Sequence, residues 1–264
     1  MEPTFESVTA LRRADDRTFV ADVPDGWQQG RGAFGGLVLA LMVRATEAVA
    51  GAPERRLRTL TAEICGPVLT GPVEIRVEPL RVGSGNSTVA ARLLQGGEVQ
   101  AHAVCVLGRG RESPPWLGVP RPSPPPWRDV APGPQTFDAP TFTQHFEYRL
   151  TGSLPFSGLG KAHAQGWVRA RRPGAARDSA LAVALADAWW PALFGLLDAP
   201  RPVATITFTL DLAATLDGLD PAAPLYHEST TLVSDEGYAP ELRTLWGEDG
   251  RLVAVNHQTF VVIR

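Results

Sequence analysis

The chain has 264 residues, 44% of them hydrophobic, and a formal net charge of −3. This length is enough to bury a full core, as one large domain or two small ones. No basic stripe with interleaved aromatics indicates nucleic-acid binding, and the apolar runs are too short and interrupted to predict a membrane span. The N-terminal residues lack the pattern of a signal peptide, so we expect a cytoplasmic protein with Cys65 and Cys105 buried and reduced.

The first half of the chain predicts one helix among several strands. An early strand lies within 5–23 and ends at the turn Pro24-Asp25-Gly26. An Ala-rich, apolar helix pattern covers 37–49. Strand patterns separated by glycines then cover 57–65, 73–79, 87–95 and 99–107. From 108 to 140 the chain becomes rich in proline, which is typical of an extended connector, and we expect its tryptophans to fix it against a surface.

The second half repeats this order. Strand patterns at 142–150 and 162–171 precede an apolar helix pattern at 180–197, and further strand patterns cover 203–212, 225–233, 239–246 and 252–263. The offset of about 145 residues indicates a duplicated domain rather than a solenoid. Consecutive strands without intervening helices predict antiparallel pairing. We therefore expect an α+β fold in which two antiparallel curved sheets each wrap around one long apolar helix.

One carboxylate, Asp187, lies in the middle of the second apolar helix pattern. Burying an unpaired charge costs roughly several kcal/mol or more, so the Asp187 carboxylate needs a partner or a raised pKa. Four residues later, Pro191 removes the helical donor for the Asp187 carbonyl, which predicts a kink at the carboxylate. Asp187 is therefore either a structural residue bonding freed backbone groups or a general base, and this stretch alone favours the structural interpretation.

Several other patterns do not predict a site. Residues 30–35 match the dinucleotide fingerprint, but no buried parallel strand precedes them and no alternating βαβ pattern follows. Glycines at this helix start either bring N–H groups close to an oxygen-rich group or allow tight helix–sheet packing. The histidines show no metal-ligand spacing, so we expect neither a metal nor a cofactor. Cys105 and His102 face opposite sides of a strand, which argues against a cysteine nucleophile.

Each half of the chain contains a series of short motifs in a defined order. The first half has Phe34-Gly35-Gly36 at the helix start, a strand at 60–67, Gly71-Pro72-Val73 and Leu80-Arg81-Val82-Gly83, with Ser87 and Gln95 beyond. The second half has Ala186-Asp187-Ala-Trp-Trp-Pro191, Ala204-Thr205-Ile206 and the stretch from Asp249 to Gln258. In order and spacing the chain resembles the acyl-CoA thioesterase II-like (TesB-like) double-hotdog proteins. The resemblance implies hotdog modules at 1–108 and 141–264, joined by a connector at 109–140.

The resemblance also implies a site in the second module. Asp187, Thr205 and Gln258 match the family's water-activating trio, with Asp187 as the base. Backbone N–H groups of Gly35 or Gly36 would stabilise the oxyanion across the module interface. The acyl chain would lie near Trp189, Trp190 and Phe194. The implied activity is hydrolysis of acyl-CoA in fatty acid metabolism, without a metal or cofactor, by a chain that can form a homo-oligomer.

Thr205 presents a conflict within this assignment. In the stretch from Thr205 to Leu210 the threonines share one strand face and the apolar residues share the other. If the apolar face covers the helix, Thr205 points away from Asp187 unless a twist or bulge intervenes, and Thr207 or Thr209 could substitute. Two alternative functions stay open: a non-catalytic acyl-CoA-binding or scaffold protein, and a hotdog enoyl-CoA hydratase or dehydratase. The absence of a histidine on or just after the helix argues against the second alternative.

Overall fold

The computed structural model describes residues 3–50, 52, 54–133, 139–158, 160–175, 178–213, 216 and 219–263. In the first half the elements are α1 (Phe5–Val8), β1 (Arg12–Arg13), β2 (Thr18–Val23), β3 (Gln28–Gln29), β4 (Gly32–Ala33), α2 (Gly35–Ala50), β5 (Arg55–Ile64), β6 (Gly71–Val82), β7 (Asn86–Gln95) and β8 (Glu98–Arg109). These confirm the expected helix and the strands after it. A short helix, α1, occupies the first residues of the region expected to hold a strand.

In the second half the elements are the 3₁₀ turns η1 (Trp127–Asp129) and η2 (Thr141–His145), β9 (Phe146–Leu150), β10 (His163–Ala170), α3 (Ser179–Asp187), η3 (Ala192–Gly195), β11 (Val203–Leu212), β12 (Leu225–Thr231), β13 (Tyr238–Gly247) and β14 (Leu252–Val262). The strand expected at 142–150 begins only at Phe146, because η2 occupies its first residues, and the other strands expected here are present within one or two residues. The helix expected at 180–197 is shorter than predicted. It ends at Asp187 because Pro191 offers no N–H to the Asp187 carbonyl, so the chain leaves the helix instead of kinking.

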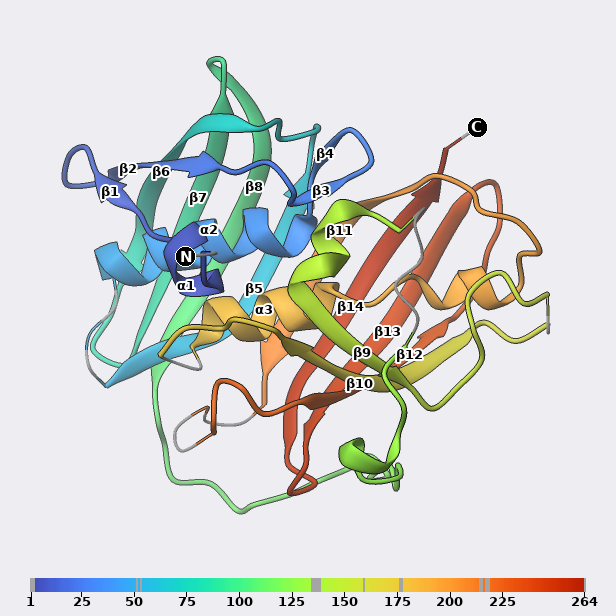
Figure 1. Ribbon diagram of the computed structural model, residues 1–264. Coiled ribbons are helices and arrows are strands. Elements are labelled where there is room, and N and C mark those ends of the chain that lie inside the picture. Colours follow the sequence, from blue (N-terminus) through green and yellow to red (C-terminus); the bar gives the residue numbers. More distant parts are fainter. Residues whose placement is uncertain are drawn as a thin grey trace.

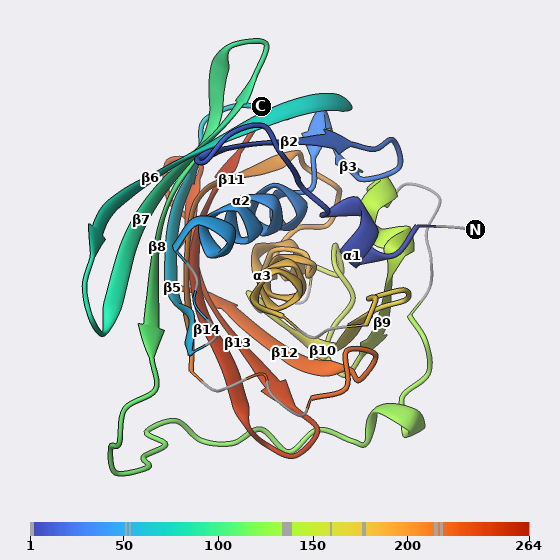
Figure 2. The same cartoon turned by 90° about the vertical axis from the view of Figure 1, so that its left-hand side faces the viewer.

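The large strands form one continuous antiparallel sheet, not the two separate sheets expected. Its order is β1-β2-β6-β7-β8-β5-β11-β14-β13-β12-β10-β9. The two halves join where β5 pairs with β11, with Thr209 opposite Thr61. Each of these strands would otherwise be an edge with unpaired N–H and C=O groups, and their pairing satisfies both edges. The sheet is strongly curved, and its concave side encloses both long helices (Figure 1, Figure 2).

Helices α2 and α3 lie side by side inside this curve (Figure 2). Both are buried on nearly all sides because both are apolar almost all the way round. They approach closely at Gly36, where an added Cβ would lie 2.9 Å from the Ala184 Cα. As a result, the N-terminus of α2 lies beside the C-terminus of α3, and Asp187 lies at that junction.

The Pro-rich segment crosses the outer face of the sheet's second half. Trp127 is buried there against the guanidinium groups of Arg149 and Arg169, whose central carbons lie 3.8 and 4.2 Å from its ring centroid. The indole N–H of Trp167 also donates to the Pro125 carbonyl. The expected fixing of the connector is therefore confirmed at Trp127. It is wrong for Trp116, which is 90% exposed.

The expectation of two buried cysteines is confirmed for Cys105 and wrong for Cys65. Cys105 lies on β8 facing the core, whereas Cys65 follows the last residue of β5 and is exposed. Burial raises the pKa of the Cys105 thiol to about 12, which leaves it protonated and unreactive. Among the described residues, no helix is long and apolar enough to cross a bilayer.

Candidate active site

Asp187 is the last residue of α3 and is only 8% exposed. Its carboxylate lies against the first turn of α2. A Cβ built on Gly35 would come within 2.8 Å of Asp187 Oδ2, and the backbone N–H of Gly36 hydrogen-bonds the carboxylate. Only glycine allows this approach, and the free N–H groups and positive end of a helix favour a carboxylate there. The glycines therefore bring N–H groups to an oxygen-rich partner, and Gly36 also allows close helix packing.

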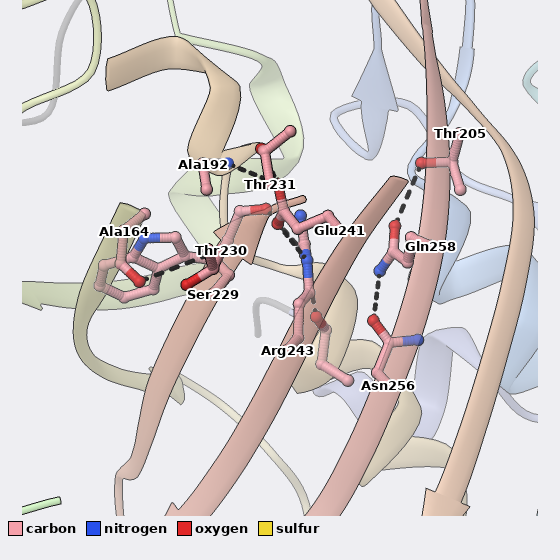
Figure 3. A network of polar contacts seen from close by, with 12 residues as sticks. Ala164, Ala192, Thr205, Ser229, Thr230, Thr231, Glu241, Arg243, Asn256 and Gln258 are labelled. Carbon is pink, nitrogen blue, oxygen red and sulfur yellow. Dashed lines mark hydrogen bonds and ion pairs between the residues drawn. The ribbon is translucent and has the colours of Figure 1, made fainter. Parts of the chain in front are cut away.

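Gln258, on β14, supplies the second contact to Asp187. Its side chain is fully buried and hydrogen-bonds the Asp187 carboxylate. Gln258 Nε2 also donates to Asn256 Oδ1 at 2.9 Å, and Asn256 Nδ2 donates to the Thr209 carbonyl at 2.7 Å. The structure thus brings Asp187 and Gln258 together. Asn256 orients the amide of Gln258 (Figure 3).

Thr205 joins this group through a bulge in β11. Its hydroxyl donates to Gln258 Oε1 at 3.4 Å. The register of β11 against β14 shifts between Thr205 and Thr207, so Thr205 lies opposite Phe260 while Phe208 lies opposite Gln258. This extra residue turns Thr205 to the concave face. Thr207 and Thr209 pair with Thr259 and His257 on the other face, which resolves the conflict in favour of Thr205.

The pKa of Asp187 is raised, chiefly because burial disfavours the charged carboxylate. Nearby Arg243 and the hydrogen bonds from Gln258 and Gly36 act in the opposite direction and favour the charged form. Glu241 adds a smaller rise through like-charge repulsion. A carboxyl group with a raised pKa and two fixed donors is a better proton acceptor than an ordinary aspartate.

Two charged residues near Asp187 were missed from the sequence. Glu241 and Arg243 lie on β13, 0% and 1% exposed, and Arg243 Nε donates to Glu241 Oε1 at 2.8 Å (Figure 3). Strand alternation is the signal that could have found them. Ala239 and Leu245 face the core. Alternation along the strand therefore turns residues 241 and 243 to the core as well, while Leu242 points outward.

The three aromatic residues expected near the acyl chain lie on the segment that follows α3. Trp189 is buried and stacks on His227 at 5.1 Å between ring centroids, and it packs beside the half-buried Trp190. Phe194, on η3, packs on Phe156 instead. Within the described part of the chain, no group of three His, Cys, Asp or Glu side chains is placed to hold a metal.

This arrangement defines a hotdog-fold protein with a buried carboxylate at the end of one central helix. The family model described as the acyl-CoA thioesterase N-terminal domain matches residues 23–108, and the model of the C-terminal domain matches residues 118–262. The chain belongs to this acyl-CoA thioesterase family and is a thioester hydrolase. No protein in the curated set matches it significantly.

Solved structures support the same fold. A conserved hot dog fold protein of unknown function from Alicyclobacillus acidocaldarius is 26% identical, with a TM-score of 0.91 over 100% of this chain and 99% of that one. An acyl-CoA thioesterase II from Mycobacterium marinum is 17% identical, with a TM-score of 0.77 over 98% of each chain. The tesB protein of Mycobacterium avium subs paratuberculosis is also 17% identical, with a TM-score of 0.78 over 98% of each. At 17% identity these two similarities establish the fold alone.

Proposed function

We propose that the protein hydrolyses acyl-CoA thioesters to the free acid and coenzyme A, with Asp187 as the general base. The observation that carries this proposal is the buried Asp187 carboxylate held by Gln258 and the Gly36 N–H. Asp187 accepts a proton from a water molecule while the oxygen of that water attacks the thioester carbonyl carbon. The resulting oxyanion collapses, the C–S bond breaks, and the thiolate leaves without needing a strong general acid.

The neighbouring groups take complementary roles in this proposal. The amide of Gln258 and the hydroxyl of Thr205 hold the attacking water, since each offers a donor and an acceptor. Because the Gly36 N–H serves Asp187, the Gly35 N–H at the first position of α2 is the donor for the oxyanion. We assign the acyl chain to the side of the site where Trp189 and Trp190 lie, with Phe194 further along η3.

The halves of the sheet correspond to two hotdog modules in this proposal, with residues 109–140 as their connector. A second candidate, an acyl-CoA-binding protein without turnover, has the same fold. The hydratase alternative requires a histidine beside the acid. The buried ring of His227 stacks on Trp189, and burial lowers the pKa of His227 well below its ordinary value. That placement favours hydrolysis.

The test is thiol release from short, medium, long and aromatic acyl-CoAs by the wild type and by Asp187→Asn. Loss of a positioned base should lower the rate by about 10²–10⁴-fold. The matched control is Asp211→Asn, which removes an exposed carboxylate on β11 and should leave the rate unchanged. Unchanged turnover in Asp187→Asn would place the base elsewhere, and tight binding without turnover in the wild type would favour the non-catalytic protein.

A further inference from the structure

The buried Glu241–Arg243 pair holds both sides of the turn that follows Asp187. Arg243 Nη1 donates to the carbonyls of Ala186, at 3.0 Å, and Trp189, at 3.2 Å. On the other side of Pro191, the Ala192 N–H donates to Glu241 Oε2 at 2.7 Å. The last carbonyls of a helix have no intrahelical donor, so the guanidinium supplies donors that the backbone lacks at the end of α3.

The same pair connects this turn to the strand that carries Gln258. In the β13–β14 register Glu241 lies opposite Gln258, and Arg243 lies opposite Asn256. Thr231, on β12, donates to Glu241 Oε2 at 3.1 Å and fixes the carboxylate from the other side. The Glu241–Arg243 pair therefore contacts both the turn around Asp187 and the strand that carries Gln258. Figure 3 shows the pair beside Gln258 and Asn256.

The first half of the sheet provides an internal comparison. It repeats the strand registers of the second half, including a shift between Leu57 and Thr59 in β5 that matches the bulge at Thr205. In β7 and β8, Val89 lies opposite Cys105 and Ala91 lies opposite Ala103. The positions equivalent to Glu241 and Arg243 are thus Val89 and Ala91. Because the same architecture forms there from apolar residues, the fold does not require a buried ion pair at this place.

We propose that Glu241 and Arg243 are positioning residues for Asp187: they hold its carboxylate at Gln258 and set the balance of charge around it. This inference rests on the proposed role of Asp187 as the base. A buried ion pair is weak support for stability and is costly to keep. Its restriction to the half that carries Asp187 and Gln258 is explained by function at that site.

Charged and titratable groups approach Asp187 from three strands. From β13 come Arg243 and Glu241, which shift the pKa of Asp187 down and up respectively. From β9 comes Tyr148, whose hydroxyl donates to the Ala188 carbonyl at 2.9 Å and whose own pKa is raised by burial and by Asp187. From β12 comes His227, whose pKa is lowered by burial and by Arg243, so that it stays neutral. The elements α2 and β14 contribute glycine N–H groups and amides there.

The experiment measures kcat/KM against pH for Arg243→Gln and Glu241→Gln. Removing the positive charge should move the acid limb to higher pH, and removing the negative charge should move it to lower pH. A purely structural role would not produce opposite shifts. The control is Arg251→Gln, which breaks the exposed Asp249–Arg251 pair on the neighbouring turn, has the same spacing, and should leave the profile in place.

A double variant keeps the test decisive if a single variant, left with one unpaired buried charge, does not fold. Glu241→Val with Arg243→Ala copies the first half and leaves no uncompensated charge. It should give an unchanged circular-dichroism spectrum, a kcat lowered by about 10- to 100-fold and a nearly unchanged KM. A folded double variant with wild-type kcat would overturn the proposal.

Asp187→Asn, measured beside these variants, separates the two proposals. If Asp187→Asn keeps wild-type turnover, the proposed base is wrong. If Asp187→Asn loses turnover while Arg243→Gln and Glu241→Gln leave the acid limb in place, only the positioning role is wrong.

Discussion

Gly35 lies so close to Asp187 that a methyl group on its α-carbon would come within 2.8 Å of the carboxylate oxygen Oδ2 and 3.2 Å of Ile64 Cδ1. The Gly35→Ala variant should therefore displace the carboxylate from Gln258 and lower kcat by about 10- to 100-fold. The folded state should tolerate the change, because alanine is a better helix former than glycine. Steady-state kinetics and a thermal melt on the same sample check both expectations.

Gly36→Ala is the informative comparison. Its Cβ would meet the Ala184 Cα at 2.9 Å and the Phe34 ring at 2.4 Å, so the clash falls on the contact between the two helices. We expect a loss of about 1–3 kcal/mol in the free energy of unfolding. Equal loss of stability in the two variants would mean that Gly35 serves packing rather than the carboxylate.

Asp187→Asn should raise the free energy of unfolding at neutral pH. Burial raises the pKa of Asp187 in the folded state, so the folded protein holds this proton more tightly than the unfolded chain does. Each unit of that rise makes the charged carboxylate cost about 1.4 kcal/mol above the folded-state pKa. The cost is absent below the ordinary aspartate pKa, near pH 4.

Urea unfolding of both proteins across pH gives the check. The stability difference between Asp187→Asn and wild type should grow as the pH rises from about 4 and should vanish below it. Asp211→Asn, at an exposed position on β11, should show no such trend. A difference independent of pH would mean that the two states bind this proton equally.

Thr205→Val should lower kcat by about 2- to 10-fold, the range expected from loss of one hydrogen bond. The hydroxyl contacts Gln258 Oε1 at 3.4 Å, and valine keeps the β-branched shape that suits the strand. Thr207→Val makes the same chemical change on the opposite face and should leave kcat unchanged. If Thr207→Val has the larger effect, the bulge does not place Thr205 in the site.

The sequence was sufficient for the features that depend on local pattern. Apolar periodicity located α2 and the start of α3, and alternation located the long strands. The pairing of Asp187 with Gln258 came from the family resemblance, whereas the raised pKa of Asp187 followed from a lone acid among apolar residues. Pro191 marked the right place, but the sequence did not show that the helix ends there instead of kinking, with Arg243 binding the carbonyls of Ala186 and Trp189.

Features that depend on pairing between distant segments were less accessible. The sequence pattern does not show which strand edges pair with each other, so it did not predict that β5 pairs with β11 to form one sheet. Regular alternation would point Thr205 away from Asp187, so a bulge was considered only as one possible explanation. One extra residue in a strand moves every residue before it to the opposite face. Glu241 and Arg243 were missed because charged residues in a strand are usually taken to face solvent.

Trp127 should be the residue that holds the Pro-rich segment to the sheet. Its ring stacks against the guanidinium groups of Arg149 and Arg169, and its backbone carbonyl accepts a hydrogen bond from Arg149 Nη1 at 3.0 Å. Trp127→Ala should cost about 3 kcal/mol of stability and lower Tm by roughly 5–10 °C. Trp116→Ala in the same segment should leave Tm unchanged, because that side chain is 90% exposed. Limited proteolysis should likewise cut the segment faster in Trp127→Ala alone, and equal rates in both variants would mean that other contacts hold it.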